Sequence, residues 1–182
     1  MAEKRLGQTD IMLTQVGLGC MGLSEYYGPP TEESAAIKLL HEAIDLGVNH
    51  FDTAELYGVG HNESLLGKAL NDRRDKVRIA TKFGPVRDPE TGAMLGLDGS
   101  KKNCRQAVEG SLRRLQTDHI DLYYLHRVDP NTPIEETVTE MAKLVVEGKI
   151  GAIGLSEVSG ATLRRAQAIH SIAAVQSEYS IF

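Results

Sequence analysis

The sequence lacks tryptophan altogether, and its 182 residues include only two cysteines, Cys20 and Cys104. These cysteines lie far apart and match no metal-ligand spacing, so we interpret both as free thiols and expect no metal site. No apolar run reaches the ~20 residues that a membrane-spanning helix needs. The N-terminus leads into no signal-peptide pattern, which favours a cytoplasmic setting without a membrane partner.

An excess of positive charge is also missing. The formal net charge is -5 at pH 7, and no basic stripe is interleaved with aromatic residues, which make up 5% of the chain. Nucleic-acid-binding surfaces need such a stripe, so we expect no nucleic-acid partner. The composition, 41% hydrophobic and 25% charged, is that of a globular protein, and residues 1–182 can form a single domain with a sizeable core.

The sequence does contain a regular alternation of two patterns. Apolar runs of strand length alternate with segments in which apolar residues recur at helical spacing. Residues 4–14 precede them and predict a hairpin that turns at residues 7–10. The expected strands are residues 15–20, 48–53, 77–81, 120–125, 150–155 and 173–179; the expected helices are residues 32–46, 62–70, 101–115, 133–147 and 160–170, and residues 83–99 are expected to form a long loop.

Capping residues indicate where several of these helices begin. Thr31 is the expected cap of the first helix, and two glutamates follow it in the first turn. Thr132 to Glu135 place a proline at the first helical position and pair Thr132 with Glu135 in a capping box. Ser100 and Ser159 are the expected caps of two further helices.

Strict alternation of strands and helices predicts a parallel sheet, either an open doubly wound sheet or a (β/α)8 barrel. An open sheet gathers its ligand contacts at one switch point, whereas a barrel uses the C-terminal ends of several strands. We therefore predict the α/β class and a parallel (β/α)8 TIM-barrel type, here with about six β/α units after the hairpin. The reason is that polar residues follow five different strands: Asp52, Lys82, His126, Ser156 and Gln176.

Residues 17–22 spell G-x-G-x-x-G after an expected strand, which is the fingerprint of a Rossmann dinucleotide site. The context differs from that fingerprint, because residues 23–30, with a Pro-Pro pair, separate the last glycine from the next helix. No acidic residue ends a strand about 20 residues further on. We interpret these glycines as positions of close backbone packing at a strand exit.

Four residues at or near strand ends are candidates for proton transfer to a carbonyl. A phenol is a poor acid at neutral pH because its unperturbed pKa is ~10. The ammonium of Lys82 would lower the pKa of Tyr57, and the carboxylate of Asp52 would keep that lysine charged. His126 could hydrogen-bond the carbonyl from the other side while hydride reaches its carbon. Taken alone, each has a structural alternative, such as a solvated lysine or a core histidine.

The same segments resemble, in order, the motifs of the aldo-keto reductase superfamily along the whole chain. The resemblance implies a (β/α)8 barrel closed at the bottom by an N-terminal hairpin, and NADPH-dependent reduction of aldehydes or ketones. The matching segments are Gly-Leu-Gly-Cys-Met-Gly at 17–22, Asp-Thr-Ala-x-x-Tyr-Gly at 52–58, Ala-Thr-Lys at 80–82, Leu-His-Arg-Val-Asp at 125–129, Gly-Leu-Ser at 154–156 and Gln-Ser-Glu-Tyr-Ser at 176–180.

Carried over by position, this resemblance assigns a role to each candidate. Tyr57 matches the proton donor, and Lys82 and Asp52 match the pair that tunes its pKa. His126 matches the residue that orients the small-molecule carbonyl substrate. The resemblance places the NADPH contacts at Met21, Asp52, Ser156 and Gln176, of which Ser156 and Gln176 match positions that hydrogen-bond the nicotinamide carboxamide.

The length of the chain limits what the resemblance implies. A closed barrel needs ~250 residues, so we expect the single domain to stop after its sixth strand. In the family, the later part supplies an aromatic that stacks on the nicotinamide and basic residues that hold the 2′-phosphate. We therefore expect the 182-residue chain alone to bind NADPH weakly and to reduce carbonyls negligibly. The alternative function is a non-catalytic, cofactor-binding regulatory subunit of the potassium-channel β type.

Overall fold

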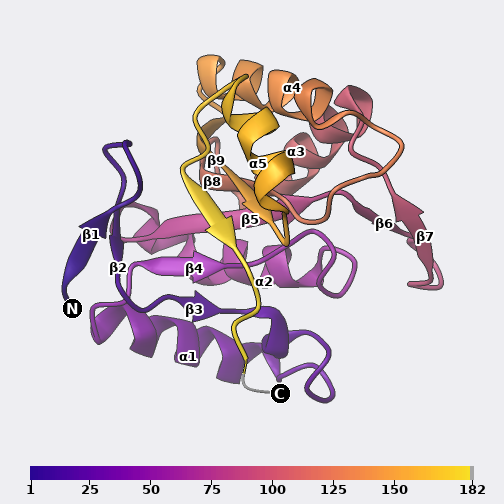
Figure 1. The fold of residues 1–182 in the computed structure, drawn as a ribbon. Coiled ribbons are helices and arrows are strands. Elements are labelled where there is room, and N and C mark those ends of the chain that lie inside the picture. Colours follow the sequence, from indigo (N-terminus) through magenta and orange to yellow (C-terminus); the bar gives the residue numbers. More distant parts are fainter. Residues whose placement is uncertain (181–182) are drawn as a thin grey trace.

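The computed structural model describes residues 1–180 and forms a curved parallel sheet with helices packed around it (Figure 1). The strand order is β10-β9-β8-β5-β4-β3, and every neighbouring pair is parallel. This arrangement confirms the predicted α/β class and incomplete (β/α)8 barrel. The strands are β3 (Leu18–Gly19), β4 (His50–Asp52), β5 (Arg78–Phe83), β8 (Ile120–Leu125), β9 (Ile150–Ser156) and β10 (Ala174–Gln176).

Helices connect successive strands and cover the outer face of the sheet. Side chains alternate between the two faces of a strand, so Phe51, Ile79 and Tyr123 point outward into one continuous core with the helices. These three side chains are at most 1% exposed. The helices are α1 (Glu33–Asp45), α2 (His61–Leu70), α3 (Lys101–Leu115), α4 (Ile134–Val146) and α5 (Gly160–Gln167), with short 3-10 helices η1 (Met21–Leu23) and η2 (Asn71–Lys76).

The inner face of the sheet is covered at one end by the N-terminal hairpin. Strands β1 (Glu3–Arg5) and β2 (Met12–Thr14) pair antiparallel, as the sequence predicts. Leu6 and Ile11, which flank the turn of the hairpin, pack against a small inner cluster. The cluster consists of Ala80, Leu122, Tyr124 and Ala152.

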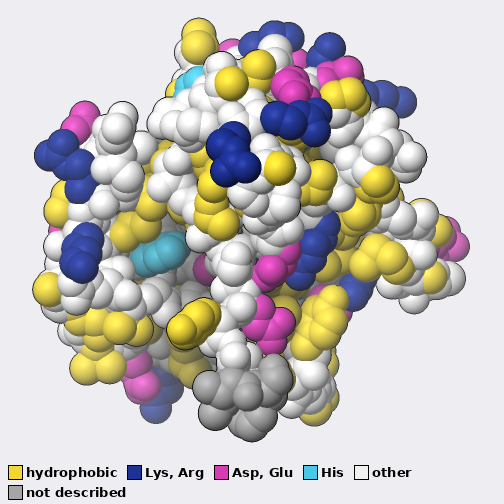
Figure 2. Space-filling view, in the orientation of Figure 1, with side chains coloured by type: hydrophobic (Ala, Val, Ile, Leu, Met, Phe, Trp, Pro, Cys, Tyr) yellow, Lys and Arg dark blue, Asp and Glu magenta, His cyan; other side chains and the backbone are white. Residues whose placement is uncertain are grey.

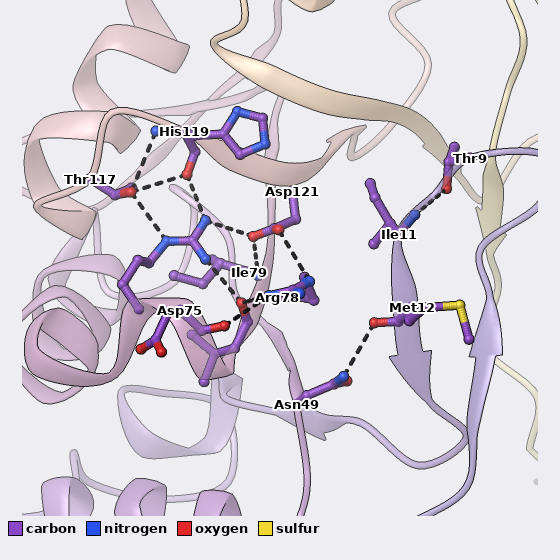
Figure 3. A network of polar contacts seen from close by, with 12 residues as sticks. Thr9, Ile11, Met12, Asn49, Asp75, Arg78, Ile79, Thr117, His119 and Asp121 are labelled. Atoms are coloured by element: carbon purple, nitrogen blue, oxygen red, sulfur yellow. Dashed lines mark hydrogen bonds and ion pairs between the residues drawn. The ribbon is translucent and has the colours of Figure 1, made fainter.

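A polar network fixes the N-terminal ends of the strands (Figure 3). The Arg74 guanidinium donates to the Asp121 carboxylate at 2.6 Å and to the His119 carbonyl at 2.7 Å. Asp121 also accepts from the Ile79 amide at 2.9 Å, which joins β8 to β5. The side chain of Asn49 donates to the Met12 carbonyl at 3.2 Å and so ties the hairpin to the sheet. The network stabilises the end of the sheet opposite the polar strand exits.

The long loop expected at residues 83–99 is instead a second hairpin. Strands β6 (Pro85–Arg87) and β7 (Met94–Leu97) pair antiparallel, with an irregular register between Val86 and Arg87. The side chain of Asp88 stabilises the turn between them, because its carboxylate accepts hydrogen bonds from the backbone amides of residues 90 and 91. All four residues of β7 are exposed, so the segment lacks the alternation by which strands are recognised.

Several expected boundaries are wrong, mostly because strands are shorter than their apolar runs. Residues 15–17 are exposed, and only Leu18–Gly19 pairs with β4. The last strand covers residues 174–176 rather than 173–179, and the fifth helix ends at residue 167 rather than 170. Residues 181–182, with which the predicted domain ends, lie outside the described residues.

Two expected caps are also wrong. The carboxylate of Glu32, not Thr31, accepts from the first free amides of α1, at 3.0 Å, because a carboxylate reaches both of them. Pro133 takes the N-cap position of α4 without a side-chain cap. Thr132 donates its hydroxyl to Asp129 at 2.7 Å, and Glu135 pairs with Arg165, so the predicted capping box does not form. Ser100 and Ser159 cap their helices as predicted.

Candidate active site

The predicted strand-end residues gather at one edge of the sheet. Asp52, Ser156 and Gln176 are the last residues of β4, β9 and β10, and Lys82 lies near the end of β5. His126 directly follows β8. Because all these strands are parallel, their C-terminal ends meet at the same edge, which brings together side chains that lie up to 124 residues apart in sequence.

A buried ammonium lies at the centre of the site. The side chain of Lys82 is 0% exposed, and its Nζ lies 2.5 Å from Asp52 Oδ1. The same Nζ donates to the Thr53 carbonyl at 2.8 Å and to the Tyr57 hydroxyl at 3.3 Å. A buried charge is tolerated only when it is paired and hydrogen-bonded, and Asp52 supplies that pairing. The structure therefore brings Asp52, Lys82 and Tyr57 into one chain of polar contacts.

Two opposing influences act on the pKa of Tyr57. Burial raises the pKa of the phenol, while the nearby Lys82 ammonium lowers it. Burial is the larger influence, so the pKa of Tyr57 lies above its ordinary value of 10.0. Lys82 lowers the pKa of Tyr57 as expected, but its effect is smaller than that of burial, so the pKa is raised overall. Tyr57 therefore keeps its proton at neutral pH and can act as an acid.

His126 faces Tyr57 across the site. The two rings meet edge to face with centroids 5.8 Å apart, and His126 is 6% exposed. Burial, together with the charges of Lys82 and Arg127, lowers the pKa of His126 to about 3. Its Nδ1 has no hydrogen-bond partner among residues 1–180. The imidazole is therefore neutral at physiological pH.

Polar groups on the far side of Tyr57 line a cavity of about 270 Å³. Ser156 accepts a hydrogen bond from Arg127 at 3.1 Å, and Gln176 donates its amide N–H to Asp52 at 3.0 Å. The Ser156 hydroxyl hydrogen and the Gln176 carbonyl oxygen can still bind a carboxamide, so this donor set fits a nicotinamide. The lining residues are Tyr57, His126, Arg127, Ser156, Glu157, Gln176, Ser177 and Glu178.

Of the four predicted cofactor contacts, Met21 and Asp52 do not line this cavity, although Asp52 accepts a hydrogen bond from Gln176, which does. Met21 lies in η1, directly after Cys20, whose amide donates to the Asp52 carbonyl at 2.8 Å. The structure thus places Met21 at the strand exit beside Asp52, and half-buried. Its side chain stands near the site without sharing the cavity of Ser156 and Gln176.

A second cavity, of about 310 Å³, lies on the other side of His126. Its wall comes largely from the β6–β7 hairpin, including Pro85, Met94 and Leu97, and is mostly apolar. Arg87 of this hairpin reaches the segment before α1, where it donates to Glu25 at 2.8 Å and to the Tyr26 hydroxyl at 2.9 Å. The site therefore has a polar side at β9 and β10 and an apolar side at the hairpin.

Sequence reasoning missed Asn62, which connects the segments around the site. Its side chain is fully buried, accepts from Thr53 at 2.6 Å and donates to the Cys20 carbonyl and the Ser24 hydroxyl, both at 2.7 Å. Asn62 thereby joins the ends of β3 and β4 next to Lys82. The sequence gives no signal of this role, because an asparagine at the start of a helix usually faces solvent.

Comparisons with known proteins agree with this geometry. A family model described as "Aldo/keto reductase family" matches residues 15–182. A curated relative from Glycine max, named probable aldo-keto reductase 1, is 46% identical over 181 residues, which are 98% of this chain and 51% of the relative. The chain thus spans about half the length of that relative.

Solved structures show the same likeness. The holo form of aldo-keto reductase AKR11C1 from Bacillus halodurans superposes with a TM-score of 0.90 at 37% identity, over 100% of this chain and 59% of that one. The glycerol dehydrogenase AKR11B4 from Gluconobacter oxydans superposes with a TM-score of 0.87 at 34% identity, over 96% of this chain and 54% of that one.

Proposed function

The chain belongs to the aldo/keto reductase family, and from this premise we propose that the protein reduces aldehydes and ketones to alcohols with hydride from NADPH. One observation carries the proposal: the Tyr57 hydroxyl lies 3.3 Å from the ammonium of a fully buried lysine that Asp52 holds in place. The proposal concerns the whole protein, since the chain spans about half the length of its curated relative.

Tyr57 supplies the proton in this scheme. As hydride bonds to the carbonyl carbon, the C=O π electrons move to oxygen, and that oxygen takes the proton of the Tyr57 hydroxyl. The phenolate left behind is stabilised by Lys82, whose charge is more favourable to the phenolate than to the phenol. Solvent then returns a proton to Tyr57. Asp52 contributes by keeping Lys82 charged and oriented.

His126 orients the substrate as a neutral donor. No described residue accepts a hydrogen bond from Nδ1 of His126, so we assign the proton of the neutral ring to Nε2, where it can donate to the carbonyl oxygen. The low pKa of His126 excludes a second positive charge beside Lys82 at physiological pH. The hydrogen bond would polarise the C=O bond and align it with the Tyr57 hydroxyl.

The cofactor, when bound, supplies the hydride. Ser156 and Gln176 would hold its carboxamide through their hydroxyl and amide groups. A carboxamide in this position would accept the Ser156 hydroxyl hydrogen and leave the contacts of Ser156 with Arg127 and of Gln176 with Asp52 intact. None of the relatives reported above is named as a regulatory subunit, and they lend no support to that alternative.

Replacement of Tyr57 by phenylalanine tests the assignment. In a polypeptide that continues this sequence through a closed barrel, Tyr57→Phe should lower kcat for aldehyde reduction by at least ~10²-fold, because a general acid is lost. The loss of NADPH absorbance measures the rate, and NADPH fluorescence should show unchanged cofactor affinity. Tyr27→Phe, at a tyrosine that is 82% exposed, is the matched control. Turnover near that of the unmodified protein in Tyr57→Phe would remove Tyr57 from this role.

A further inference from the structure

The segment that carries Tyr57, residues 53–60 between β4 and α2, has an unfavourable backbone. Three consecutive residues have positive φ: Gly58 at +60°, Val59 at +52° and Gly60 at +85°. Glycine adopts such angles freely, but a β-branched residue such as Val59 does so only at a cost in free energy. A conformation of this kind persists only when surrounding groups hold it, so contacts from outside the segment must fix it.

Arg114 of α3 supplies such contacts at both ends of the segment. Its Nε donates to Glu63 at 2.7 Å, and its terminal NH2 group donates to Glu55 at 3.1 Å. Glu55 precedes Tyr57 by two residues, and Glu63 lies in the first turn of α2. One guanidinium therefore joins the two sides of the Tyr57 segment from outside the barrel.

The same contacts lead to the strand that carries Lys82. Glu63 is 0% exposed and accepts the Thr81 hydroxyl at 2.5 Å, while the Glu55 amide donates to the Lys82 carbonyl at 3.2 Å. Arg114 thus holds two glutamates that each contact β5 as well, Glu63 through its carboxylate and Glu55 through its backbone amide. Through them, the Tyr57 segment and the end of β5 share one set of polar contacts.

Two glycines leave the space that the Arg114 side chain occupies. A Cβ atom at Gly60 would lie 2.7 Å from Arg114 Cδ, and one at Gly110 would lie 2.9 Å from its NH1 nitrogen. A Cβ atom does not approach a carbon or nitrogen to which it is not bonded so closely. The Arg114 side chain therefore lies in the narrow space between residues 53–60 and α3 that the two glycines leave. This close packing holds the guanidinium in one orientation.

We propose that Arg114 is a positioning residue that sets the distance between the Tyr57 hydroxyl and Lys82 by clamping residues 53–60 through Glu55 and Glu63. The inference rests on the proposed function for the role of Tyr57 as acid. The clamp itself is a property of the folded chain and is measured without turnover.

The experiment compares two arginines of α3. Arg114→Lys keeps the charge but cannot reach both glutamates. Glu55→Gln removes the negative charge from one contact of Arg114, which weakens that contact, while the buried Glu63 pair stays intact. Arg105→Lys is the matched control, because Arg105 also binds two glutamates, Glu140 and Glu147, but away from the site. Amide hydrogen exchange of residues 54–60 and a 13Cζ-tyrosine NMR titration of Tyr57, assigned with Tyr57→Phe, report the state of the segment.

Amide exchange of residues 54–60 should be at least ~10-fold faster in Arg114→Lys and in Glu55→Gln, and unchanged in Arg105→Lys. The pKa of Tyr57 should fall toward its ordinary value in the first two variants, because burial is the main cause that raises it. If Arg114→Lys does not fold, the amide exchange and Tyr57 titration of Glu55→Gln test the clamp. Unchanged exchange and Tyr57 titration in the folded variants, or an equal change in Arg105→Lys, would overturn the clamp. Absence of carbonyl reduction in a closed-barrel protein whose segment responds as expected would refute the proposed function alone.

Discussion

At the scale of single residues, the site depends on how its buried charges are matched. Lys82 is fully buried, and Asp52 is its only carboxylate partner among residues 1–180. A buried ammonium without a carboxylate partner is unfavourable, and the proposed stabilisation of a Tyr57 phenolate depends on this charge. The Asp52–Lys82 pair therefore keeps a positive charge next to a phenol that burial keeps protonated.

His126 should make the stability of the folded chain depend on pH. Its pKa is lowered from 6.5 to about 3 in the folded chain, so the unfolded chain binds a proton more readily as the pH falls below 6.5. Stability is therefore lost between pH 6.5 and about 3, and through this group the chain should be about 2 kcal/mol less stable at pH 5 than at pH 7. Urea unfolding of the chain at the two pH values measures this difference.

The variant His126→Gln should reduce the stability difference between pH 7 and pH 5 by that amount, since glutamine does not titrate. His170→Gln, in the turn after α5, is the control and should keep the full difference. An identical pH dependence in His126→Gln and in the unmodified chain would show that His126 titrates normally in the folded state.

The sequence predicts a residue of the site only where that residue stands at the end of an apolar run of strand length. Asp52, Lys82 and His126 stand at the ends of apolar runs, so their convergence follows from the parallel sheet alone. Arg114 gives no such signal, because in the sequence it is one of several arginines on a helix. Its role depends on Glu55 and Glu63, 59 and 51 residues earlier, and on space that glycines leave.

At the scale of elements, the contact between α2 and α3 depends on a glycine. A Cβ atom at Gly67 would lie 2.2 Å from the carbonyl oxygen of Arg114 in α3. Backbone atoms cannot yield as a flexible side chain can, so Gly67→Ala should push the two helices apart. The expected loss is about 1–3 kcal/mol of unfolding free energy, after the gain of ~1 kcal/mol that alanine brings to a helix.

Chemical denaturation measures this loss, and Gly19→Ala is the control. Gly19 has no atom within 4 Å of its Cβ position and no positive φ, so its replacement should change stability by no more than ~0.5 kcal/mol. Equal stability of the two variants would mean that α2 and α3 can separate without cost.

Elements differ in how far the sequence determines them. Helices α2 and α3 lie within one residue of their predicted bounds because apolar periodicity and, for α3, the Ser100 cap indicate the same segment. The β6–β7 hairpin was not predicted, because its second strand is exposed throughout. The predicted caps Thr31 and Thr132 are wrong for a different reason. Glu32 accepts from the amides of α1 in place of Thr31, and the Thr132 hydroxyl donates to Asp129 in place of capping α4.

At the scale of the whole molecule, alternation of strands and helices is the strongest signal in the sequence. It predicts the parallel order of six strands, because each helix returns the chain to the same edge of the sheet. Alternation does not predict curvature, which follows from the twist of the strands and from small residues on the inner face, such as Gly154. A Cβ atom there would lie 2.3 Å from the ring of Tyr124, which packs in the cluster on the inner face of the sheet.

The open sheet limits how the 182-residue polypeptide can hold a cofactor. In the described residues, β3 and β10 end the sheet and each has a partner on one side only. The space-filling view shows hydrophobic atoms and a histidine in a hollow beside the N-terminal hairpin (Figure 2). Beside Ser156 and Gln176, the cavity is lined by two carboxylates, Glu157 and Glu178, which repel phosphates, and by one cation, Arg127, which donates to the His126 carbonyl and the Ser156 hydroxyl. The lining of this cavity, with one cation and two carboxylates, does not favour the binding of phosphates beside the proposed carboxamide contacts.

We therefore expect the purified 182-residue polypeptide to bind NADPH weakly or not at all and to reduce aldehydes negligibly, even though its Tyr57–Lys82 geometry is in place. Titration with NADPH, followed by cofactor fluorescence, measures the affinity, and a polypeptide that continues the sequence through a closed barrel is the comparison. The closed barrel should bind NADPH with at least ~10-fold higher affinity, because charge-assisted contacts to the phosphates add to the carboxamide contacts. Micromolar binding with turnover by the 182-residue polypeptide would instead show that residues 1–182 hold the cofactor without the remaining strands.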